Sequence, residues 1–400
     1  MNISQLKNDL SRCVKCGQCK TVCPVYRVTH KEQFLARGKL SLCLALAQKK
    51  VAPSCELRAI LDSCMKCYQC VANCPTGIHP VHLILQTRQY LRGGGIKSAL
   101  TRFLMRTIIP HRQRYNLFMK LARISQKILP RKGQQLRHIP FIFENKMTVP
   151  EISQEPALET LPEITGKSKK KIGLFLGCLI NYVYPEIALY VVKILTSLGY
   201  EVVIPKKQAC CGIPALYLND RIAACKLYRH NVAAFRRFNL DAVVTACASC
   251  GTALKEEYAL MDKNNKQALG AKVFDISEFL SNKMFHIKTG QEREKITYHD
   301  PCHLRFSQGI WKEPRKIVTQ IADISEAAES WRCCGGGGTF SVFYRNLSQE
   351  IGKLKCETLL ETDAKTIITA CPGCILQLRA TLSGNVPVKH IVEFLWEKIA

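Results

Sequence analysis

The sequence is poor in acidic residues and lacks a long apolar run. It has 31 Asp and Glu against 58 Lys and Arg, which gives a formal net charge of +27. No uninterrupted apolar run reaches the roughly 18 residues that are typical of a membrane span, and the most apolar segment, from Ile172, is interrupted by Asn181, Pro185, Glu186 and Lys193. The first residues, MNISQLKNDL, contain no apolar signal core. We therefore expect a cytoplasmic protein without a membrane span.

The sequence also lacks the glycine-rich motifs that bind nucleotides and flavins. No G-x-G-x-x-G follows an expected strand, and no Walker motif is present. We therefore expect no flavin on this chain. If the protein takes part in the oxidation of an organic substrate, that step must take place on another subunit.

Cysteine, in contrast, is abundant, with 22 residues in ordered positions. In a chain of 400 residues without a signal core, a disulfide scaffold is a weaker interpretation than metal binding, because disulfides are rare inside cells. Four cysteines fit no spacing, and we interpret them as packing residues: Cys43, Cys55, Cys225 and Cys356. The remaining cysteines fall into two pairs of repeated sets.

Residues 13–24 and 64–75 repeat one spacing, C-x2-C-x2-C-x3-C-P, as CVKCGQCKTVCP and CMKCYQCVANCP. This spacing is typical of proteins with two 4Fe-4S clusters, in which the fourth cysteine of each run binds the other cluster. It predicts these ligands: Cys13, Cys16, Cys19 and Cys74 for cluster 1, and Cys64, Cys67, Cys70 and Cys23 for cluster 2. Zinc is the alternative, but zinc sites use cysteine pairs. We expect an α+β, ferredoxin-like and mostly helical module over residues 1–90, with a helix from Ala36 between the runs.

Residues 91–170 are expected to form a basic helical connector that ends in a linker without apolar periodicity. From Leu91 to Thr148 there are 13 Lys or Arg against one acid, Glu144. Apolar residues recur at helical spacing and are interrupted by prolines at 110, 130 and 140. A solvated connector or a subunit-docking face is the simplest interpretation, and peripheral membrane contact is the alternative. Nucleic acid is not expected as a partner, because aromatic stacking platforms are lacking.

From Lys171 onward the chain repeats itself with a long period. Apolar, β-branched runs alternate with helical stretches, which predicts two α/β domains with parallel sheets, residues 171–285 and 286–400. We call them CCG domains after the Cys-Cys-Gly in each. The first cysteine set is Cys178, Cys210, Cys211, Cys247 and Cys250, and the second is Cys302, Cys333, Cys334, Cys371 and Cys374. Because each cysteine follows a strand, we expect the five in each half to converge.

Five thiolates in each set indicate a cluster of more than one iron, since adjacent cysteines do not easily bind one ion tetrahedrally. Buried packing cysteines and zinc in one half are the alternatives. In the second half alone, His299, Asp300 and His303 surround Cys302. We hypothesise that His299 and His303 handle protons, with a structural role as the alternative. A glycine run is also confined to this half and is expected to approach a cluster or ligand, unless it is a flexible loop: Gly335, Gly336, Gly337 and Gly338.

The motifs HDPCHLRFSQGI, RCCGGGGTFSV and TACPGCILQLR, with CCGIPA and ACASCG in the first half, resemble the iron-sulfur subunit of glycolate oxidase and related 2-hydroxyacid dehydrogenases. The resemblance covers essentially the whole chain. The third subunit of anaerobic glycerol-3-phosphate dehydrogenase and the CCG subunit of heterodisulfide reductase are similar at a greater distance. In the last of these, each complete CCG group holds a non-cubane 4Fe-4S cluster, which implies one or two such clusters here.

The resemblance implies an electron-transfer subunit of a flavin-dependent glycolate or lactate dehydrogenase complex. A separate FAD-containing subunit would oxidise the hydroxyacid, and electrons would pass to a quinone or another carrier. Two alternatives remain. A CCG cluster could itself reduce a disulfide or another substrate, as in heterodisulfide reductase, or the chain could be a membrane-anchoring subunit of the glycerol-3-phosphate dehydrogenase type.

Overall fold

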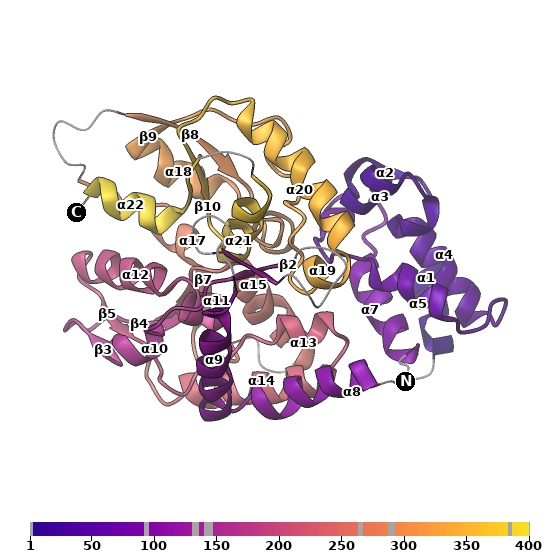
Figure 1. Ribbon diagram of the computed structural model, residues 1–400, viewed down its shortest axis with the longest axis horizontal. Helices are drawn as coiled ribbons and strands as arrows, with labels where there is room; N and C mark the ends of the chain where they lie inside the picture. Colours follow the sequence, from indigo (N-terminus) through magenta and orange to yellow (C-terminus); the bar gives the residue numbers. More distant parts are fainter. Residues whose placement is uncertain are drawn as a thin grey trace.

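The computed structural model describes residues 3–91, 96–129, 136–139, 147–262, 267–286, 293–382 and 386–399. An N-terminal helical module (indigo), a connector (violet) and two α/β units (magenta, and orange to yellow) follow one another along the chain (Figure 1). The module lies at one end of the molecule, and the two units lie side by side at the other. Three residues of the expected connector lie outside the described ranges: Pro130, Pro140 and Glu144.

The module consists of short helices around two cysteine loops. The helices are α1 (Lys7–Ser11), α2 (Gln18–Val22), α3 (Pro24–Thr29), α4 (Ala36–Ala47), α5 (Cys55–Asp62), α6 (Gln69–Ala72) and α7 (Pro80–Tyr90). Both loops have left-handed residues at the same places, with φ of 57° and 87° at Lys15 and Gly17, and 57° and 61° at Lys66 and Tyr68. The duplication is therefore visible in the backbone. The expectation of a mostly helical module with a helix from Ala36 is confirmed, and no strand occurs between residues 3 and 91.

The first α/β unit contains a five-stranded sheet of order β3-β5-β4-β6-β7. Its strands are β3 (Ile164–Thr165), β4 (Lys171–Phe175), β5 (Glu201–Val203), β6 (Ala242–Thr245) and β7 (Lys272–Asp275). All pairings are parallel except that of β3 with β5. β3 and the short helix α10 (Ala157–Thr160) lie in the expected linker, and Ala157 and Leu158 are buried in the unit's core. Part of the expected linker therefore belongs to the first unit.

The helices of this unit follow its strands in sequence. They are α11 (Gly177–Tyr182), α12 (Pro185–Ser197), α13 (Ile213–Tyr217), α14 (Arg221–Phe235), α15 (Ala248–Thr252), a π-helical turn (Ala253–Glu257), α16 (Tyr258–Met261) and α17 (Ile276–Leu280). α12 and α13 carry proline in the first turn, where its missing N–H leaves no helical hydrogen bond unmade.

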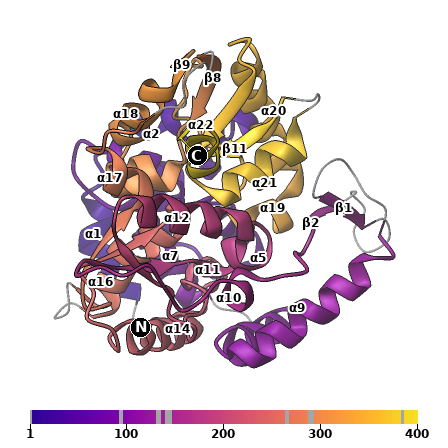
Figure 2. The ribbon, with the colours of Figure 1, turned by 90° about the vertical axis from the view of Figure 1, so that its left-hand side faces the viewer.

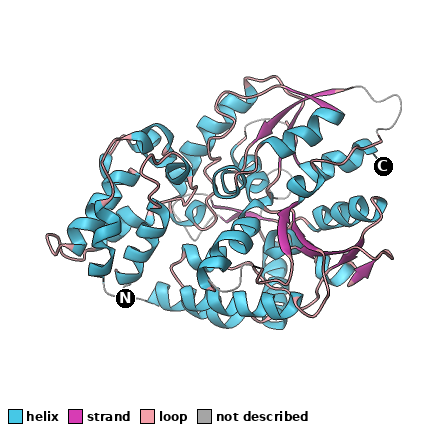
Figure 3. Cartoon of the chain, turned by 180° about the vertical axis from the view of Figure 1, so that it is seen from behind, coloured by secondary structure: helices cyan, strands magenta, loops and turns pink. Residues whose placement is uncertain are grey.

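The second unit repeats this arrangement with a four-stranded parallel sheet of order β11-β10-β8-β9. Its strands are β8 (Glu294–His299), β9 (Ala322–Ile324), β10 (Thr366–Thr369) and β11 (Val388–His390). Its helical elements are a π-helical turn (His303–Ser307), α18 (Lys312–Ile321), α19 (Phe340–Phe343), α20 (Arg345–Leu360), α21 (Pro372–Thr381) and α22 (Ile391–Ile399). The order matches β7-β6-β4-β5 of the first unit, so the predicted pair of α/β repeats is confirmed (Figure 3).

The two units share one apolar core, whereas the module has its own. α12 packs against α22, and Val191 and Phe394 on these helices belong to the same buried cluster. A smaller cluster joins the module to the second unit and contains Met65, Phe340 and Ile351. The module is therefore packed against the second CCG unit through apolar side chains.

The connector contains α8 (Ile96–Phe103), a π-helical turn (Leu104–Ile108) and α9 (Arg112–Gln126), followed by the antiparallel strands β1 (Leu136–Ile139) and β2 (Met147–Pro150). Figure 2 shows α9 at the edge of the molecule. The connector is held on the first unit by an ion pair, with Arg106 Nε 2.8 Å from Asp220 Oδ2, and by Tyr115 and Tyr182, whose ring centroids are 4.9 Å apart. Among the described residues, none of the helices combines the length and apolar character needed to cross a bilayer.

Candidate metal centre

The two cysteine loops of the module come together as the spacing predicts. One cavity is lined by the cysteines of predicted cluster 1 together with one cysteine of the other run: Cys13, Cys16, Cys19, Cys74 and Cys70. In the second set, burial raises the pKa of Cys70, and the nearby thiol groups of Cys64 and Cys23 raise it further. Buried thiols that disfavour one another's ionisation need a positive centre among them to become thiolates, which fits a metal cluster.

The ten CCG cysteines lie at the carboxyl ends of parallel strands or at the start of the helices that follow. β4 leads to α11, which contains Cys178, and β6 leads to Cys247, the N-cap of α15. In the second unit, β10 leads to Cys371, the N-cap of α21. Because the strands of each sheet are parallel, their loops meet at one edge, and the cysteines meet with them.

The thiol groups of these cysteines form one continuous series of contacts. In the first unit the series runs through Cys178, Cys210, Cys211, Cys250 and Cys247. In the second unit it runs through Cys302, Cys333, Cys334, Cys374 and Cys371. The two series are joined by a contact between Cys247 and Cys371. The structure therefore brings each predicted set together and also places the two sets against each other.

Neighbouring thiols promote ionisation at matching positions of the two sets. Hydrogen bonds from Cys210 and Cys250 lower the pKa of Cys211 to about 5. At the corresponding Cys334, a hydrogen bond from the adjacent Cys333 helps to bring the pKa well below its ordinary value. The thiolate is the form that binds metals, so both sites favour the ligand form of these cysteines.

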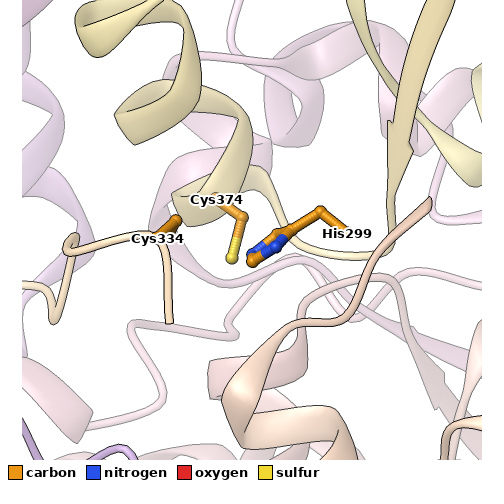
Figure 4. A group of neighbouring side chains, drawn as sticks. All are labelled: His299, Cys334 and Cys374. Carbon is orange, nitrogen blue, oxygen red and sulfur yellow. The ribbon is translucent and has the colours of Figure 1, made fainter. Parts of the chain in front are cut away.

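His299, the last residue of β8, lies beside the cysteines of the second set (Figure 4). One of its ring nitrogens and the sulfur atoms of Cys334 and Cys374 all lie within 4.8 Å of one another. The imidazole is completely buried, and neither ring nitrogen has a hydrogen-bond partner among the described residues. A buried imidazole without a partner is costly. Its position against buried thiolates fits a cluster whose sulfide or iron would satisfy the ring.

Asp300 does not face the cysteines but forms a buried ion-pair network. Its carboxylate accepts hydrogen bonds from Arg315 at 2.8 Å, from Arg305 at 2.7 Å and from Ser330 at 3.2 Å. Burial alone would raise its pKa, but the hydrogen bond and charge of Arg315, with the charge of Arg305, hold it below its ordinary value. Asp300 therefore fixes the loop that carries Cys302.

His303 also points away from the cysteines and joins three parts of the molecule. Its Nε2 lies 3.0 Å from the carbonyl oxygen of Lys66 in the module and 2.6 Å from the hydroxyl of Tyr217 in the first unit. Its Nδ1 lies 2.9 Å from the hydroxyl of Ser249. Burial lowers its pKa, so the neutral ring is favoured, with Nε2 donating to Lys66 and Nδ1 accepting from Ser249.

The glycine run after Cys334 is a packed turn. Gly335, Gly337 and Gly338 have positive φ, and a Cβ on Gly335 would lie 2.4 Å from the carbonyl oxygen of Ser348 in α20. Gly336 would place a Cβ 3.7 Å from the sulfur of Cys334. The turn needs glycine because of its backbone conformation and its close contact with α20.

Some residues around the site were not identified from the sequence. A Cβ on Gly177, whose φ is 68°, would lie 2.6 Å from the sulfur of Cys250, so glycine permits this cysteine to approach the strand end. The only sequence signal was a glycine directly before Cys178. Tyr217 and Ser249 gave no signal, because their contacts with His303 arise between distant parts of the chain.

Comparison with protein families supports this assignment of the cysteines to iron-sulfur sites. Residues 172–255 and 296–379 each match a model described as a cysteine-rich domain, CCG. Residues 9–78 match a 4Fe-4S dicluster domain. The two CCG matches coincide with the two α/β repeats.

Several relatives match over nearly the whole chain. A Bacillus subtilis protein named "Probable glycolate oxidase iron-sulfur subunit" is 28% identical over 98% of this chain and 94% of its own length. A subunit of the "Fumarate reductase (CoM/CoB)" of Methanothermobacter marburgensis is 27% identical over 96% of this chain and 72% of its length. An uncharacterized iron-sulfur protein of Methanococcus maripaludis is 30% identical with the same two coverages. A crystal structure of a hypothetical protein from Helicobacter pylori has a similar fold, with a TM-score of 0.53 and 11% identity over 91% of this chain and 68% of that one.

Proposed function

This chain belongs to the CCG-domain iron-sulfur proteins that carry a 4Fe-4S dicluster domain, and we propose that it is the electron-transfer subunit of a flavin-dependent 2-hydroxyacid dehydrogenase complex. Its partner would be a FAD-containing subunit that oxidises glycolate or lactate, and its acceptor a quinone or another carrier. The name of the Bacillus subtilis relative and the lack of flavin-binding motifs in this sequence support the proposal. Clusters bound by these thiolates would take up and release single electrons.

The observation that carries the proposal is that the ligand sets adjoin one another. Cys67 of the module lies in the same apolar cluster as Cys333 of the second CCG set. Burial raises the pKa of Cys67, and the nearby thiol of Cys302 raises it further. The second set in turn contacts the first through Cys371 and Cys247. The module, the second CCG set and the first CCG set thus follow one another in space, as an electron relay requires.

We propose different roles for the two histidines of the second site. His299 lies where its ring would hydrogen-bond to a cluster, and His303 positions the module on the two CCG units. Proton handling by either residue stays a prediction. It would be contradicted if His299→Ala and His303→Ala left acceptor reduction and its pH profile unchanged.

The proposal is tested by producing the chain anaerobically together with the flavoprotein encoded by its host. We expect the two to co-purify, and glycolate or lactate to bleach the iron-sulfur absorption within the complex. Metal analysis should find at least about eight irons per chain, two 4Fe-4S clusters in the module alone, and should show whether zinc occupies a CCG site. Absence of donor-dependent bleaching in a fully loaded complex would contradict the proposal.

A second candidate function is supported by the contact between the two CCG sets. Because Cys247 and Cys371 meet, a small disulfide substrate could reach both sets at once. The name of the Methanothermobacter relative, which mentions CoM and CoB, agrees with such chemistry for that protein. Disulfide-dependent oxidation of the chemically reduced, isolated chain would favour this candidate over the electron-transfer role.

Peripheral membrane contact is supported by one face of the connector. Large apolar side chains on α8 and α9 are exposed: Leu100, Phe103, Leu117, Phe118, Leu121 and Ile124. Basic residues such as Arg114 and Lys120 accompany them, which suits an anionic bilayer surface. We expect flotation with anionic vesicles that Leu117→Ser with Leu121→Ser reduces. Unchanged flotation would assign this face to subunit docking.

A further inference from the structure

A cavity of about 440 Å³ lies where the module, the connector and both CCG units meet. Its wall includes Lys66 and Arg88 of the module, Met105 of the connector, Tyr217 of the first unit and Phe340 of the second. In Figure 1 the elements that carry these residues, α7, α13 and α19, and the end of α8 surround this region. None of the metal-binding cysteines lines the cavity, so it is a site separate from the sulfur cage.

Two buried cations converge at the inner end of this cavity. Arg88 Nη2 donates to the carbonyl oxygen of Tyr217 at 3.0 Å, and Lys66 Nζ approaches the same oxygen at 3.4 Å. Both side chains are more than nine-tenths buried. Arg88 also contacts Asp62, but its Nη1 has no hydrogen-bond partner among the described residues. Buried donors without partners indicate that an oxygen atom of a ligand belongs there.

The acidic side chains of the cavity are already paired. Asp62 contacts Arg88 and lies 3.6 Å from Arg58, and Asp220 is paired with Arg106. Lys66 has no carboxylate within ion-pair distance among the described residues. The inner end is therefore electropositive and suits an oxygen that carries negative charge, or that gains it on reduction.

The walls and rim of the cavity are apolar and aromatic. Phe340 and Tyr344 stack with ring centroids 5.2 Å apart. Phe343 on the rim is 62% exposed, and α8 adds the exposed Leu100 and Phe103 on either side of the lining residues 101 and 102. A small soluble carboxylate would gain nothing from this rim. A ring with polar oxygens and an apolar tail matches the electropositive end, the aromatic walls and the rim together.

The cavity also adjoins both ligand sets that would exchange electrons with a molecule inside it. Lys66 lies between Cys64 and Cys67 in the second cysteine loop of the module. Phe340 shares an apolar cluster with Cys67 and with Cys333 of the second CCG set. A ligand against these walls would therefore lie next to the place where the module meets the second CCG site.

We propose that this cavity binds the head group of a lipid-soluble quinone, with one carbonyl oxygen at Lys66 and Arg88 and the tail leaving over the apolar rim. The inference rests on the proposed function, in which this chain passes electrons to a quinone. The quinone would take up two electrons, supplied singly by reduced iron-sulfur clusters, and two protons from water. Both of its carbonyl groups then become hydroxyl groups.

The binding step is tested on the anaerobically purified, cluster-loaded chain with an azido-substituted ubiquinone analogue as photolabel. We expect cross-links in residues 101–105 or 339–344, and decylubiquinone should compete for them. Labelling confined to other segments, or competition by glycolate or fumarate but not by decylubiquinone, would overturn the proposal. Hydroxyacid-dependent bleaching of the clusters in the complex is measured separately, because its failure would contradict the proposed function and leave quinone binding intact.

Variants give the second test. Arg88→Gln should weaken decylubiquinone binding at least tenfold, and Arg88→Lys should restore part of it. Phe343→Glu changes an exposed residue, so it should fold normally and still weaken binding. Met284→Glu is the matched control, since Met284 is 83% exposed and does not line the cavity. Equal dissociation constants in Phe343→Glu, Met284→Glu and the parent chain would overturn the proposal even if Arg88→Gln failed to fold.

Discussion

The two CCG units have the same strand order and the same five cysteines, but their surroundings differ at the strand that precedes the first cysteine. β4 ends at Phe175 and β8 at His299, and each of these residues pairs with the last residue of the next strand in its sheet. Leu176 follows in the first unit and Asp300 in the second, and all four residues are buried. The first site is thus bordered by apolar side chains, and the second by an imidazole and an ion-pair network.

The units also differ in their neighbours. The second cysteine set adjoins the module, as the apolar cluster with Cys67 and Cys333 shows, whereas Tyr115 of the connector lies near Cys178 of the first set. The duplication has therefore kept the metal-binding geometry while the environment has diverged. Equal sets of ligands do not imply equal roles, and substitutions at matching positions can separate those roles.

The largest effects are expected from removing one ligand in each unit. Cys334→Ser and Cys211→Ser should each lower the iron content by about four per chain, because each removes one cluster. Cys334→Ser should also abolish electron transfer between the module and the first site. Cys225→Ser is the control, since Cys225 belongs to neither set. Iron analysis and stopped-flow absorbance measure both effects, and a Cys334→Ser protein with full iron content would contradict the assignment.

The next effect is on stability, at the ion-pair network that only the second unit has. Asp300→Asn should lower the free energy of unfolding by about 3–5 kcal/mol, because it leaves the buried charge of Arg315 without its partner. The pKa of Asp300 is below its unfolded value, so its stabilisation is present above that unfolded value, about 3.9, and is lost as the pH falls through the folded pKa. Asp300→Asn should therefore flatten the acid side of the stability profile.

Urea unfolding at several pH values tests this prediction. The matched control is Asp323→Asn, which breaks the exposed pair with Arg293 and should cost no more than about 1 kcal/mol. Equal costs for Asp300→Asn and Asp323→Asn would show that the network does not distinguish the two units.

A smaller loss of stability is expected at the junction with the module. His303→Ala removes the contacts with Lys66, Tyr217 and Ser249 and should cost about 1–3 kcal/mol, since it leaves buried polar groups without partners. We also expect faster proteolysis between the module and the CCG units. His286→Ala, at an exposed histidine, should change neither measurement. Unchanged proteolysis in His303→Ala would limit this residue to a local role.

The smallest effect is expected from exchanging the residues that end β4 and β8. His299→Phe should lower the reduction potential of the second site by roughly 40 mV, which corresponds to a hydrogen bond of about 1 kcal/mol to the reduced cluster. Phe175→His should raise the potential of the first site in the same way. Redox titration followed by EPR measures both changes. A shift of equal sign in both variants would contradict the idea that His299 makes the sites unequal.

Much of this architecture could be predicted from the sequence because it depends on local patterns. Apolar runs such as KIGLFLG and KTIITA became β4 and β10, and the cysteines after them converged because parallel strands end at one edge of a sheet. The spacing of the cysteine runs was enough to predict the loops of the module. The segment around Leu158 was not predicted to pack on the first unit, because its few apolar residues show no periodicity.

The relations between the parts could not be predicted in this way. The contact of Cys247 with Cys371, the position of His303 against Lys66, and the cavity at Arg88 all join residues more than 100 positions apart, or parts of different units. They depend on how finished units pack, which a local sequence pattern does not determine. The sequence also placed His299 and His303 in one group, whereas the structure separates a residue at the sulfur cage from one at the module junction.

The most direct test of the central claim, that the second CCG site links the module to the first site, is magnetic coupling measured by EPR. In the fully reduced chain we predict that the signals of the module's clusters are broadened by a neighbouring spin. This broadening should disappear in Cys334→Ser and persist in Cys211→Ser. Loss of the coupling in Cys211→Ser alone would place the first site next to the module and contradict the account.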